Sequence, residues 1–142
     1  MRAYYGRRQM NIFDALPLTF HIAKGVDDPE YKLFFNYYSQ LEEKKRRGEE
    51  EKNIWIVKPG EFSNRGHGIS VCHSLDDVLL RLRGKERSSD GSARTFILQK
   101  YLEKPLLYKS RKFDIRHYLL ITCFNGAVRA YWYPEGYIRT SS

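Results

Sequence analysis

The segment NIWIVKP, residues 53–59, is the starting point from which we predict the fold. It is rich in residues that favour β-strands and it stops at a proline, so we expect a strand here. Side chains alternate along a strand, which puts Ile54, Ile56 and Lys58 on one face. The loop GEFSNRGHG follows at 60–68, and GISVC at 68–72 is a second strand candidate. The two strands are predicted to form a hairpin with a long tip.

Upstream of this hairpin, the sequence predicts one long helix. Residues 1–27 have an irregular or extended pattern, with the strand-like segment LPLTFHI at 16–22. Asp28 is suited to cap a helix, and Pro29 is suited to its first turn. Apolar residues then recur at helical spacing and should face a core. They are Tyr31, Phe34, Phe35, Tyr38 and Leu41.

Downstream of the hairpin, the pattern is mostly that of strands. Ser74 is suited to cap a short helix over 75–83, and TFILQKYL at 95–102 is a strand candidate. The polar segment 84–94 is expected to be mobile. A longer strand over 112–124 turns at Asn125-Gly126, a dipeptide typical of type I′ hairpins, and returns over 127–133. The predicted class is α+β, with a mainly antiparallel sheet and flanking helices.

The composition is that of a folded chain. Hydrophobic residues make up 42% and aromatic residues 15% of the 142 residues. No apolar run reaches the roughly 20 residues of a membrane helix, and no secretory signal is evident, so the cytosol is the expected location and no membrane partner is expected. Cys72 and Cys123 are expected to be buried, reduced thiols. The four histidines lack the spacing of a zinc site.

The net charge of +8 lies entirely in the second part of the chain. Residues 1–77 hold 12 basic and 12 acidic side chains, whereas residues 78–142 hold 13 and 5. A basic segment suggests an anionic partner, although a solvated surface without a partner explains the charge equally well. An RNA partner is disfavoured, because Tyr131, Trp132 and Tyr133 accompany Ile, Leu and Val as in a core.

Lys58 is the first candidate for chemistry. It ends an apolar strand beside a loop that contains Gly66 and Gly68, so it could place a point charge on a phosphate that the loop amides also approach. The loop is not a Walker loop, because Arg65 stands five residues after Gly60, and Val71 breaks a GxGxxG pattern. A plain hairpin with a snorkelling lysine is the alternative.

Two further candidates lie in the second part of the chain. In KFDIR, alternation puts Lys112, Asp114 and Arg116 on one face, where the carboxylate could accept hydrogen bonds and the arginine could bind phosphate oxygens. Arg139 follows the turn-like Glu135-Gly136 and could stabilise a transferring phosphoryl group. Exposed surface charges are the alternative for both.

The order of five motifs resembles the tubulin–tyrosine ligase-like family, whose fold is ATP-grasp. The motifs are WIVKP, RGHGI, LQKYL, KFDIR and EGYIRTSS. The similarity runs from about Leu16 to Ser142 and is densest from Asn53 onward. It implies an N-terminal segment over 1–52 with one long helix, and an incomplete ATP-grasp nucleotide-binding portion over 53–142.

The resemblance also implies a role for each matching residue. Residues that would hold the phosphates are Lys58 and the loop residues Arg65, Gly66, Gly68 and Ile69. Residues that would hold the adenine are Gln99, Lys100, Tyr101 and Leu102, the last through its backbone amide. Lys112 would lie near the acceptor or a phosphate, and Asp114 near the ribose. The catalytic pair would be Arg116, near the γ-phosphate, and Arg139, near the amino acid or an acyl-phosphate.

The family chemistry is an ATP-dependent ligation. ATP phosphorylates a carboxylate, and the amine of a free amino acid then displaces the phosphate. The resemblance implies the acidic C-terminal tail of tubulin as substrate, and hence a cytoplasmic protein at microtubules or cilia. EGYIRTSS is more similar to the tyrosine ligase, whereas KPGEFSNRGHGI is more similar to members that add glycine or glutamate, so the amino acid stays open.

Magnesium is the point at which the chain departs from the family pattern. ATP-grasp enzymes hold Mg²⁺ through acidic and Glu-x-Asn residues on later strands, whereas Glu135 is the only acidic residue after Arg116 here. We therefore expect no metal ligands in this chain and no ligase activity from these 142 residues alone. A truncated, non-catalytic nucleotide- or tubulin-binding protein is the alternative function.

Overall fold

The computed structural model describes residues 2–49, 52–60, 66–83 and 94–141, which form two compact units. The units are Met1–Leu102 and Glu103–Ser142. The boundary predicted after residue 52 lies inside the first unit, because strand β1 (Thr19–Ile22) joins the same sheet as β2 (Trp55–Pro59) and β4 (Phe96–Lys100). The segment expected to be mobile, 84–94, lies outside the described residues except for Arg94.

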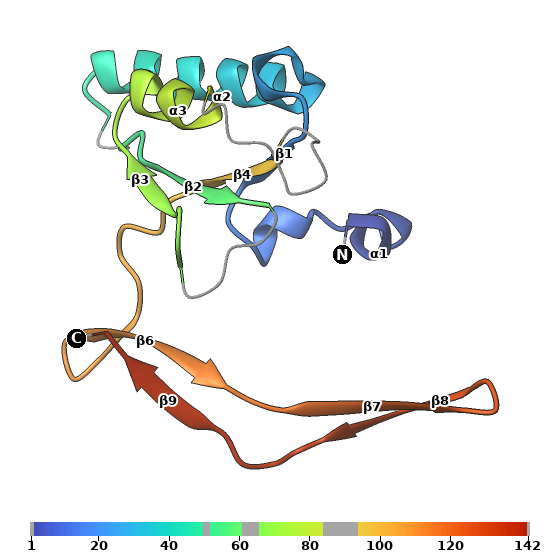
Figure 1. Cartoon of the computed structure of the whole chain (residues 1–142). Coiled ribbons are helices and arrows are strands. Elements are labelled where there is room, and N and C mark those ends of the chain that lie inside the picture. Colours follow the sequence, from blue (N-terminus) through green and yellow to red (C-terminus); the bar gives the residue numbers. More distant parts are fainter. Residues whose placement is uncertain (1, 50–51, 61–65, 84–93, 142) are drawn as a thin grey trace. The chain divides into compact units, whose positions relative to one another are not determined.

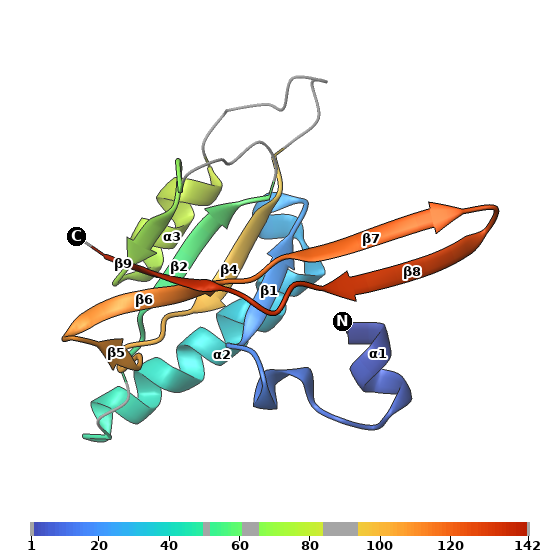
Figure 2. The same ribbon diagram turned by 90° about the horizontal axis from the view of Figure 1, so that it is seen from below.

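The first unit is built on a four-stranded antiparallel sheet with the order β1-β4-β2-β3 (Figures 1 and 2). β3 (Ser70–Cys72) pairs with β2, which confirms the predicted hairpin. β4 lies between β2 and β1, so that Ile56 and Thr19 both stand opposite Gln99 on its two sides. Strands that are far apart in the sequence are thus neighbours in the sheet.

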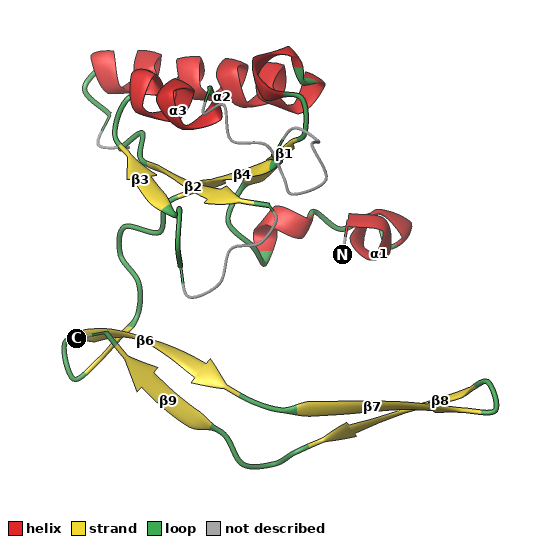
Figure 3. Cartoon of the chain, in the orientation of Figure 1, coloured by secondary structure: helices red, strands yellow, loops and turns green. Residues whose placement is uncertain are grey.

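Two helices, α2 (Pro29–Arg46) and α3 (Leu75–Leu82), cover one face of this sheet (Figures 1 and 3). Their apolar sides meet alternate residues of the strands in a single core. The predicted helical stripe is confirmed, except that Phe35 is 43% exposed. The buried apolar residues are Phe20, Ile22, Tyr31, Phe34, Tyr38, Leu41, Trp55, Val57, Cys72, Val78, Leu82 and Leu98.

Trp55 lies at the centre of this core and is fully buried. Its ring meets Phe34 edge-on at 4.8 Å between centroids, a geometry that aromatic pairs favour. Its indole N–H donates to Asn53 Oδ1 at 2.7 Å, and Asn53 Nδ2 donates to the carbonyl of Tyr38 at 3.0 Å. The indole N–H of Trp55 and the side-chain amide of Asn53 are therefore both hydrogen-bonded inside the core, and they link β2 to α2.

Both helices begin at the capping residues that the sequence predicts. Asp28 accepts from the amide of Glu30 at 2.8 Å and from the amides of Ala23 and Lys24 through its other oxygen. Burial alone would raise the pKa of Asp28, but these amide hydrogen bonds outweigh it and lower the pKa below its ordinary value. Ser74 forms a capping box with Asp77 at the start of α3.

The N-terminal prediction is only partly right. Residues 1–27 were expected to be irregular or extended, but Arg2–Arg7 forms helix α1, and two short 3-10 turns follow at Ile12–Asp14 (η1) and Gly25–Asp27 (η2). The strand expected over 16–22 is confined to Thr19–Ile22. No helix in the described part of the chain is both long enough and apolar enough to cross a membrane.

The second unit consists of β-strands. β5 (Leu107–Tyr108), β6 (Arg111–Arg116) and β9 (Tyr137–Thr140) form one antiparallel sheet, and β7 (Leu119–Phe124) pairs with β8 (Ala127–Trp132). The long strand expected over 112–124 is interrupted at His117, whose ring stacks on Trp132 at 4.7 Å. Asn125 and Gly126 have φ of 49° and 78°, which confirms the predicted turn.

The aromatic residues at the end of β8 are exposed. The sequence placed Tyr131, Trp132 and Tyr133 in a core, but their exposed fractions are 49%, 63% and 53%, so that expectation is wrong. Cys72 is buried as expected, whereas Cys123 is exposed. The α+β class, with antiparallel sheets and flanking helices, is confirmed and fits part of an ATP-grasp fold.

We expect Trp55→Ala to lower the free energy of unfolding by about 3–5 kcal/mol, because it removes a large buried side chain and leaves Asn53 without its indole partner. Leu80→Ala is the matched control, since Leu80 is 71% exposed on α3 and should change stability by less than about 0.5 kcal/mol. Urea unfolding followed by circular dichroism measures both. Equal effects of the two substitutions would contradict this account of the core.

Candidate functional site

The face of the first sheet that points away from the helices carries a chain of polar side chains. Lys58 Nζ donates to Gln99 Oε1 at 2.7 Å, and Gln99 Nε2 donates to Thr19 Oγ1 at 2.8 Å. The hydroxyl of Thr19 donates in turn to the carbonyl of Pro17 at 2.7 Å. Three neighbouring strands, β2, β4 and β1, each contribute one of these half-buried side chains.

The alternation of β2 explains why Lys58 lies on this face. Trp55 and Val57 are buried under the helices, so Ile56 and Lys58 must point to the other side. Gln99 is in the same position on β4, because its neighbour Leu98 is fully buried. The amide of Gln99 holds the Lys58 ammonium through one hydrogen bond, and an ammonium has two further N–H groups with which to bind an anion.

The loop before β3 turns tightly at its two glycines. Gly66 and Gly68 have φ of 79° and 77°, and the amide of Ile69 donates to the carbonyl of Gly66 at 3.2 Å. A Cβ at Gly68 would come within 2.8 Å of the Pro59 ring, so this position requires glycine both for its backbone and for its space. Ile69 is 40% exposed, and Arg65 lies outside the described residues.

The residues that follow Gln99 do not join its hydrogen-bonded chain with Lys58 and Thr19. Lys100 pairs opposite Trp55 on the helix-covered side of the sheet, and its ammonium donates to the carbonyl of Lys52. Tyr101 donates its amide to the carbonyl of Ile54 at 3.0 Å, and the side chain of Leu102 is 61% exposed. Gln99 and Lys58 are thus brought together, whereas the Lys100 side chain is directed away from them.

In the second unit, Asp114 and Arg139 stand directly opposite each other on β6 and β9. Arg139 Nε and Nη2 donate to the two oxygens of Asp114 at 2.8 and 3.0 Å, a bidentate geometry that only arginine provides. The hydrogen bond from Arg139 is the main cause of the lowered pKa of Asp114, and the charge of Arg116 adds to it. The same bond raises the pKa of Arg139.

Lys112 shares a hollow of about 290 Å³ with this ion pair. The hollow is lined by Lys112, Phe113, Asp114, Arg139, Thr140 and Ser141. Arg116 lies on the same strand face, two residues beyond Asp114 and opposite Tyr137. The face predicted from KFDIR is therefore formed, and Arg139 joins it from β9. Gly136 permits the approach of that strand, since a Cβ there would lie 2.8 Å from the carbonyl oxygen of Arg116.

The magnesium ligands of an ATP-grasp enzyme are not found among these residues. In the described ranges, no group of three or more His, Cys, Asp or Glu side chains could hold a metal ion. Asp114 is occupied by Arg139, and Glu135, in the segment between β8 and β9, accepts a hydrogen bond from the Tyr133 hydroxyl. The donor set does not fit a magnesium site of the family type.

Thr19 is the site residue that the sequence did not reveal. LPLTFHI predicts a strand there, but no local pattern shows that this strand pairs with β4 and sets Thr19 opposite Gln99 across 80 residues of sequence. The alternation of LQKYL does place Gln99 on the face opposite Leu98. The sequence does not show which strand β1 pairs with or in which register, because both depend on the assembled sheet.

Comparison with known proteins identifies the family. The model of the tubulin-tyrosine ligase family matches residues 8–142, so the chain belongs to this family. It is 39% identical over 125 residues to Tubulin glycylase 3B of Drosophila melanogaster, which covers 87% of this chain and 16% of the relative. It is 40% identical over 95 residues to Tubulin monoglycylase TTLL3 of Homo sapiens, covering 66% and 12%.

A third relative, Tubulin glycylase 3B of Tetrahymena thermophila, is 41% identical over 91 residues, which cover 64% of this chain and 7% of the relative. The chain thus spans less than a fifth of the length of each of these relatives. All three are named as glycylases of tubulin, a substrate that the sequence motifs also indicated.

We expect Arg139→Gln to raise the pKa of Asp114 toward its ordinary value, because it replaces a charged bidentate donor by a neutral amide. A carboxyl-carbon NMR titration measures this pKa directly. Arg129→Gln is the control with the same charge change, since Arg129 lies on β8 and not on this face. An Asp114 pKa that Arg139→Gln leaves unchanged would show that the ion pair does not persist in solution.

Proposed function

We propose that this chain is the nucleotide-holding portion of an ATP-dependent ligase that adds glycine to tubulin. Membership of the tubulin-tyrosine ligase family and the three glycylase relatives support the reaction and the amino acid. The observation that carries the nucleotide assignment is the hydrogen-bonded chain from Lys58 through Gln99 to Thr19. A plain snorkelling lysine would extend into solvent, whereas this ammonium is held on the sheet.

In the first unit, Lys58 supplies positive charge for the phosphates and Gln99 fixes its position. The ammonium is partly desolvated and already aligned, so little side-chain entropy is lost when an anion binds. The amide of Gln99 lies beside it and is also suited to hydrogen bond a base edge. Gly66 and Gly68 give the neighbouring loop the backbone freedom to approach a phosphate, with Arg65 and Ile69 as its flanks. Leu102 would offer its backbone amide at the adenine hinge, next to Tyr101.

In the second unit, Arg139 and Arg116 are the groups that would stabilise negative charge during ligation. Phosphorylation of a carboxylate spreads charge over the transferring phosphoryl oxygens, and prepositioned guanidinium groups stabilise it. Asp114 holds Arg139 in a fixed orientation through two hydrogen bonds and offers a carboxylate to a ribose or to the ammonium of glycine. Lys112 adds a point charge at the same hollow.

The substrate assignment agrees with the charge of the chain. Residues 78–142 carry the whole net charge of +8, which suits an acidic tubulin tail as well as ATP. A protein that modifies tubulin would act at the cytoskeleton. Glycine is the amino acid that we favour over tyrosine and glutamate, because the three relatives described above, each about 40% identical, are named as glycylases.

We expect ATP to bind the chain and Lys58→Ala to raise the dissociation constant about tenfold or more. A charge-assisted hydrogen bond contributes about 1.5–3 kcal/mol, and 1.4 kcal/mol corresponds to a factor of ten. Isothermal titration calorimetry with ATP measures the change. Lys32→Ala is the matched control, since Lys32 is exposed on α2, away from the polar face. If Lys58→Ala and Lys32→Ala bind ATP with equal affinity, Lys58 does not contact the nucleotide.

Transfer of glycine to tubulin separates catalysis from binding alone. Incubation of the chain with tubulin, ATP, magnesium and radiolabelled glycine is expected to give no labelled tubulin, because the described residues offer no family-type magnesium ligands. ATP binding without transfer fits a nucleotide-holding portion. Efficient transfer that depends on Arg139 would show instead that this chain holds the whole catalytic set.

A further inference from the structure

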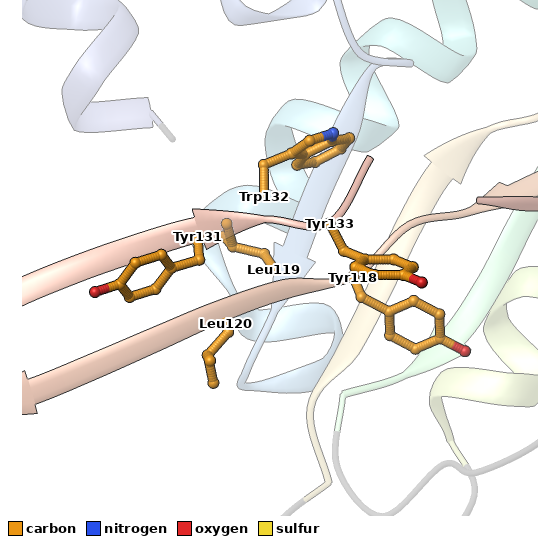
Figure 4. Close-up of a pocket in the computed structure, with 6 residues that line it drawn as sticks. All are labelled: Tyr118, Leu119, Leu120, Tyr131, Trp132 and Tyr133. Atoms are coloured by element: carbon orange, nitrogen blue, oxygen red, sulfur yellow. The ribbon is translucent and has the colours of Figure 1, made fainter. Parts of the chain in front are cut away.

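The polar side chains on the open face of the first sheet, the face that points away from the helices, donate hydrogen bonds in one direction. Lys58 donates to Gln99 at 2.7 Å, and Gln99 donates to Thr19 at 2.8 Å. Thr19 donates in turn to the carbonyl of Pro17 at 2.7 Å. The hollow at the ribbon of β7 and β8 is of another kind, since leucine and aromatic side chains line it (Figure 4). Donors and acceptors in a fixed order can pass an orientation from one side chain to the next, and the first sheet supplies that order.

The side-chain amide of Gln99 can hold Lys58 in only one of its two orientations. An amide has an acceptor end, the oxygen, and a donor end, the NH₂ group, and a half-turn about its last bond exchanges the two. An ammonium has three N–H groups and no acceptor, so it bonds the oxygen and not the NH₂ group. The position of the Lys58 ammonium therefore depends on which end of the Gln99 amide faces β2.

The hydroxyl of Thr19 selects between these two orientations. A hydroxyl has one O–H donor, and that of Thr19 is used on the carbonyl of Pro17, which can only accept. Thr19 therefore presents a lone pair to β4, and the NH₂ group of Gln99 is the end of the amide that fits it. The reversed amide would set its oxygen against the oxygen of Thr19 and its NH₂ group against the Lys58 ammonium, so that both hydrogen bonds would be lost.

Strand pairing puts Thr19 where it can orient the amide. Its neighbour Phe20 is buried in the core, so Thr19 points to the open face, and it stands directly opposite Gln99 in the register of β1 and β4. The amide of Lys100 donates to the carbonyl of Leu18 at 2.8 Å, which also ties the segment just before β1 to β4. Because threonine is branched at Cβ, its side chain has little freedom to turn the hydroxyl away.

A threonine at this position can also be explained by strand preference alone, since threonine favours β-strands. On that account the hydroxyl only satisfies itself on Pro17, and its removal leaves Gln99 and Lys58 in place. The geometry favours a role for the hydroxyl, because Thr19, Gln99 and Lys58 are all half-buried. Without the hydroxyl, the NH₂ group of Gln99 would face an apolar methyl group, which favours rotation of the amide away from its present orientation.

We propose that Thr19 is a positioning residue, whose hydroxyl fixes the orientation of the Gln99 amide and thereby the position of the Lys58 ammonium on the open face. The part of this inference that concerns ATP rests on the proposed function, whereas the part that concerns Gln99 applies to the chain without nucleotide. Thr19 acts through two hydrogen bonds and does not touch the nucleotide. An ammonium that is already in position loses less side-chain entropy when it binds a phosphate.

Two substitutions separate the hydroxyl of Thr19 from the shape of its side chain. Thr19→Val keeps a β-branched residue in the strand and removes the hydroxyl, whereas Thr19→Ser keeps the hydroxyl and removes the methyl group. In the chain without nucleotide, we expect the Gln99 side-chain amide of Thr19→Val to exchange with water about threefold to tenfold faster, the range that loss of one hydrogen bond gives. The amide of Thr19→Ser should exchange at the rate of the parent chain. NMR of the isotope-labelled chains measures both rates.

The affinity for ATP shows whether the effect reaches Lys58. In isothermal titration calorimetry, Thr19→Val should weaken ATP binding about threefold to tenfold, and Thr19→Ser should weaken it by less than about twofold. In a chain that already carries Lys58→Ala, Thr19→Val should have no further effect, because the ammonium through which Thr19 acts is absent.

Four results would overturn the proposal. Equal exchange rates of the Gln99 amide in the parent chain and in Thr19→Val would show that the hydroxyl does not orient it. Equal effects of Thr19→Val and Thr19→Ser would assign the change to strand packing. An ATP affinity that Thr19→Val leaves unchanged would show that the orientation of Gln99 does not set the position of Lys58. A loss of affinity that persists beside Lys58→Ala would show that Thr19 contacts the nucleotide itself.

Failure of the proposed function gives a different result. If the parent chain does not bind ATP, the nucleotide assignment is wrong, and the exchange rates of the Gln99 amide alone decide whether Thr19 positions that amide. Faster exchange in Thr19→Val, with the parent rate in Thr19→Ser, would then still support the positioning role.

Discussion

The burial of Trp55 constrains the rest of the first unit. Its ring occupies the space between α2 and the sheet, and its indole N–H reaches the helix through Asn53. Once Trp55 points to the helices, strand alternation sends Lys58 to the open face, three residues later. On β4, Leu98 likewise points to the helices, so its neighbour Gln99 points to the open face. The core and the polar chain on the opposite face are two consequences of one strand periodicity.

The Asp114–Arg139 pair has a corresponding role in the second unit. It joins β6 to β9 across a sheet with few buried residues and keeps a guanidinium in a fixed orientation. Because both side chains are about half exposed, the pair contributes little to stability. The main effect of the ion pair is on the position of Arg139, which it keeps in the same hollow as Lys112. A ligand that competes for Asp114 would release Arg139 toward other oxygens.

The sequence predicted the local elements well because their signals are local. Asp28-Pro29, Ser74 and Asn125-Gly126 each act through neighbouring backbone groups, and each has the predicted structure. Burial in the second unit was not predictable in the same way. Tyr131 and Trp132 have the pattern of core residues, but no helix or third strand among the described residues of the second unit packs on the ribbon to which they belong. Lys100 stays a predicted adenine contact, and strand alternation directs its side chain to the face of β4 opposite that of Gln99.

We propose that the Lys58–Gln99 group on the first sheet binds a nucleotide. Gln99 reports on this directly, because its side-chain amide gives an NMR signal and already bonds Lys58 and Thr19. Titration of the isotope-labelled chain with ATP should shift the Gln99 side-chain signal in a saturable way, and Lys58→Met should abolish that shift. An unchanged Gln99 signal at ATP concentrations that saturate shifts elsewhere would place the nucleotide away from this face and contradict the account.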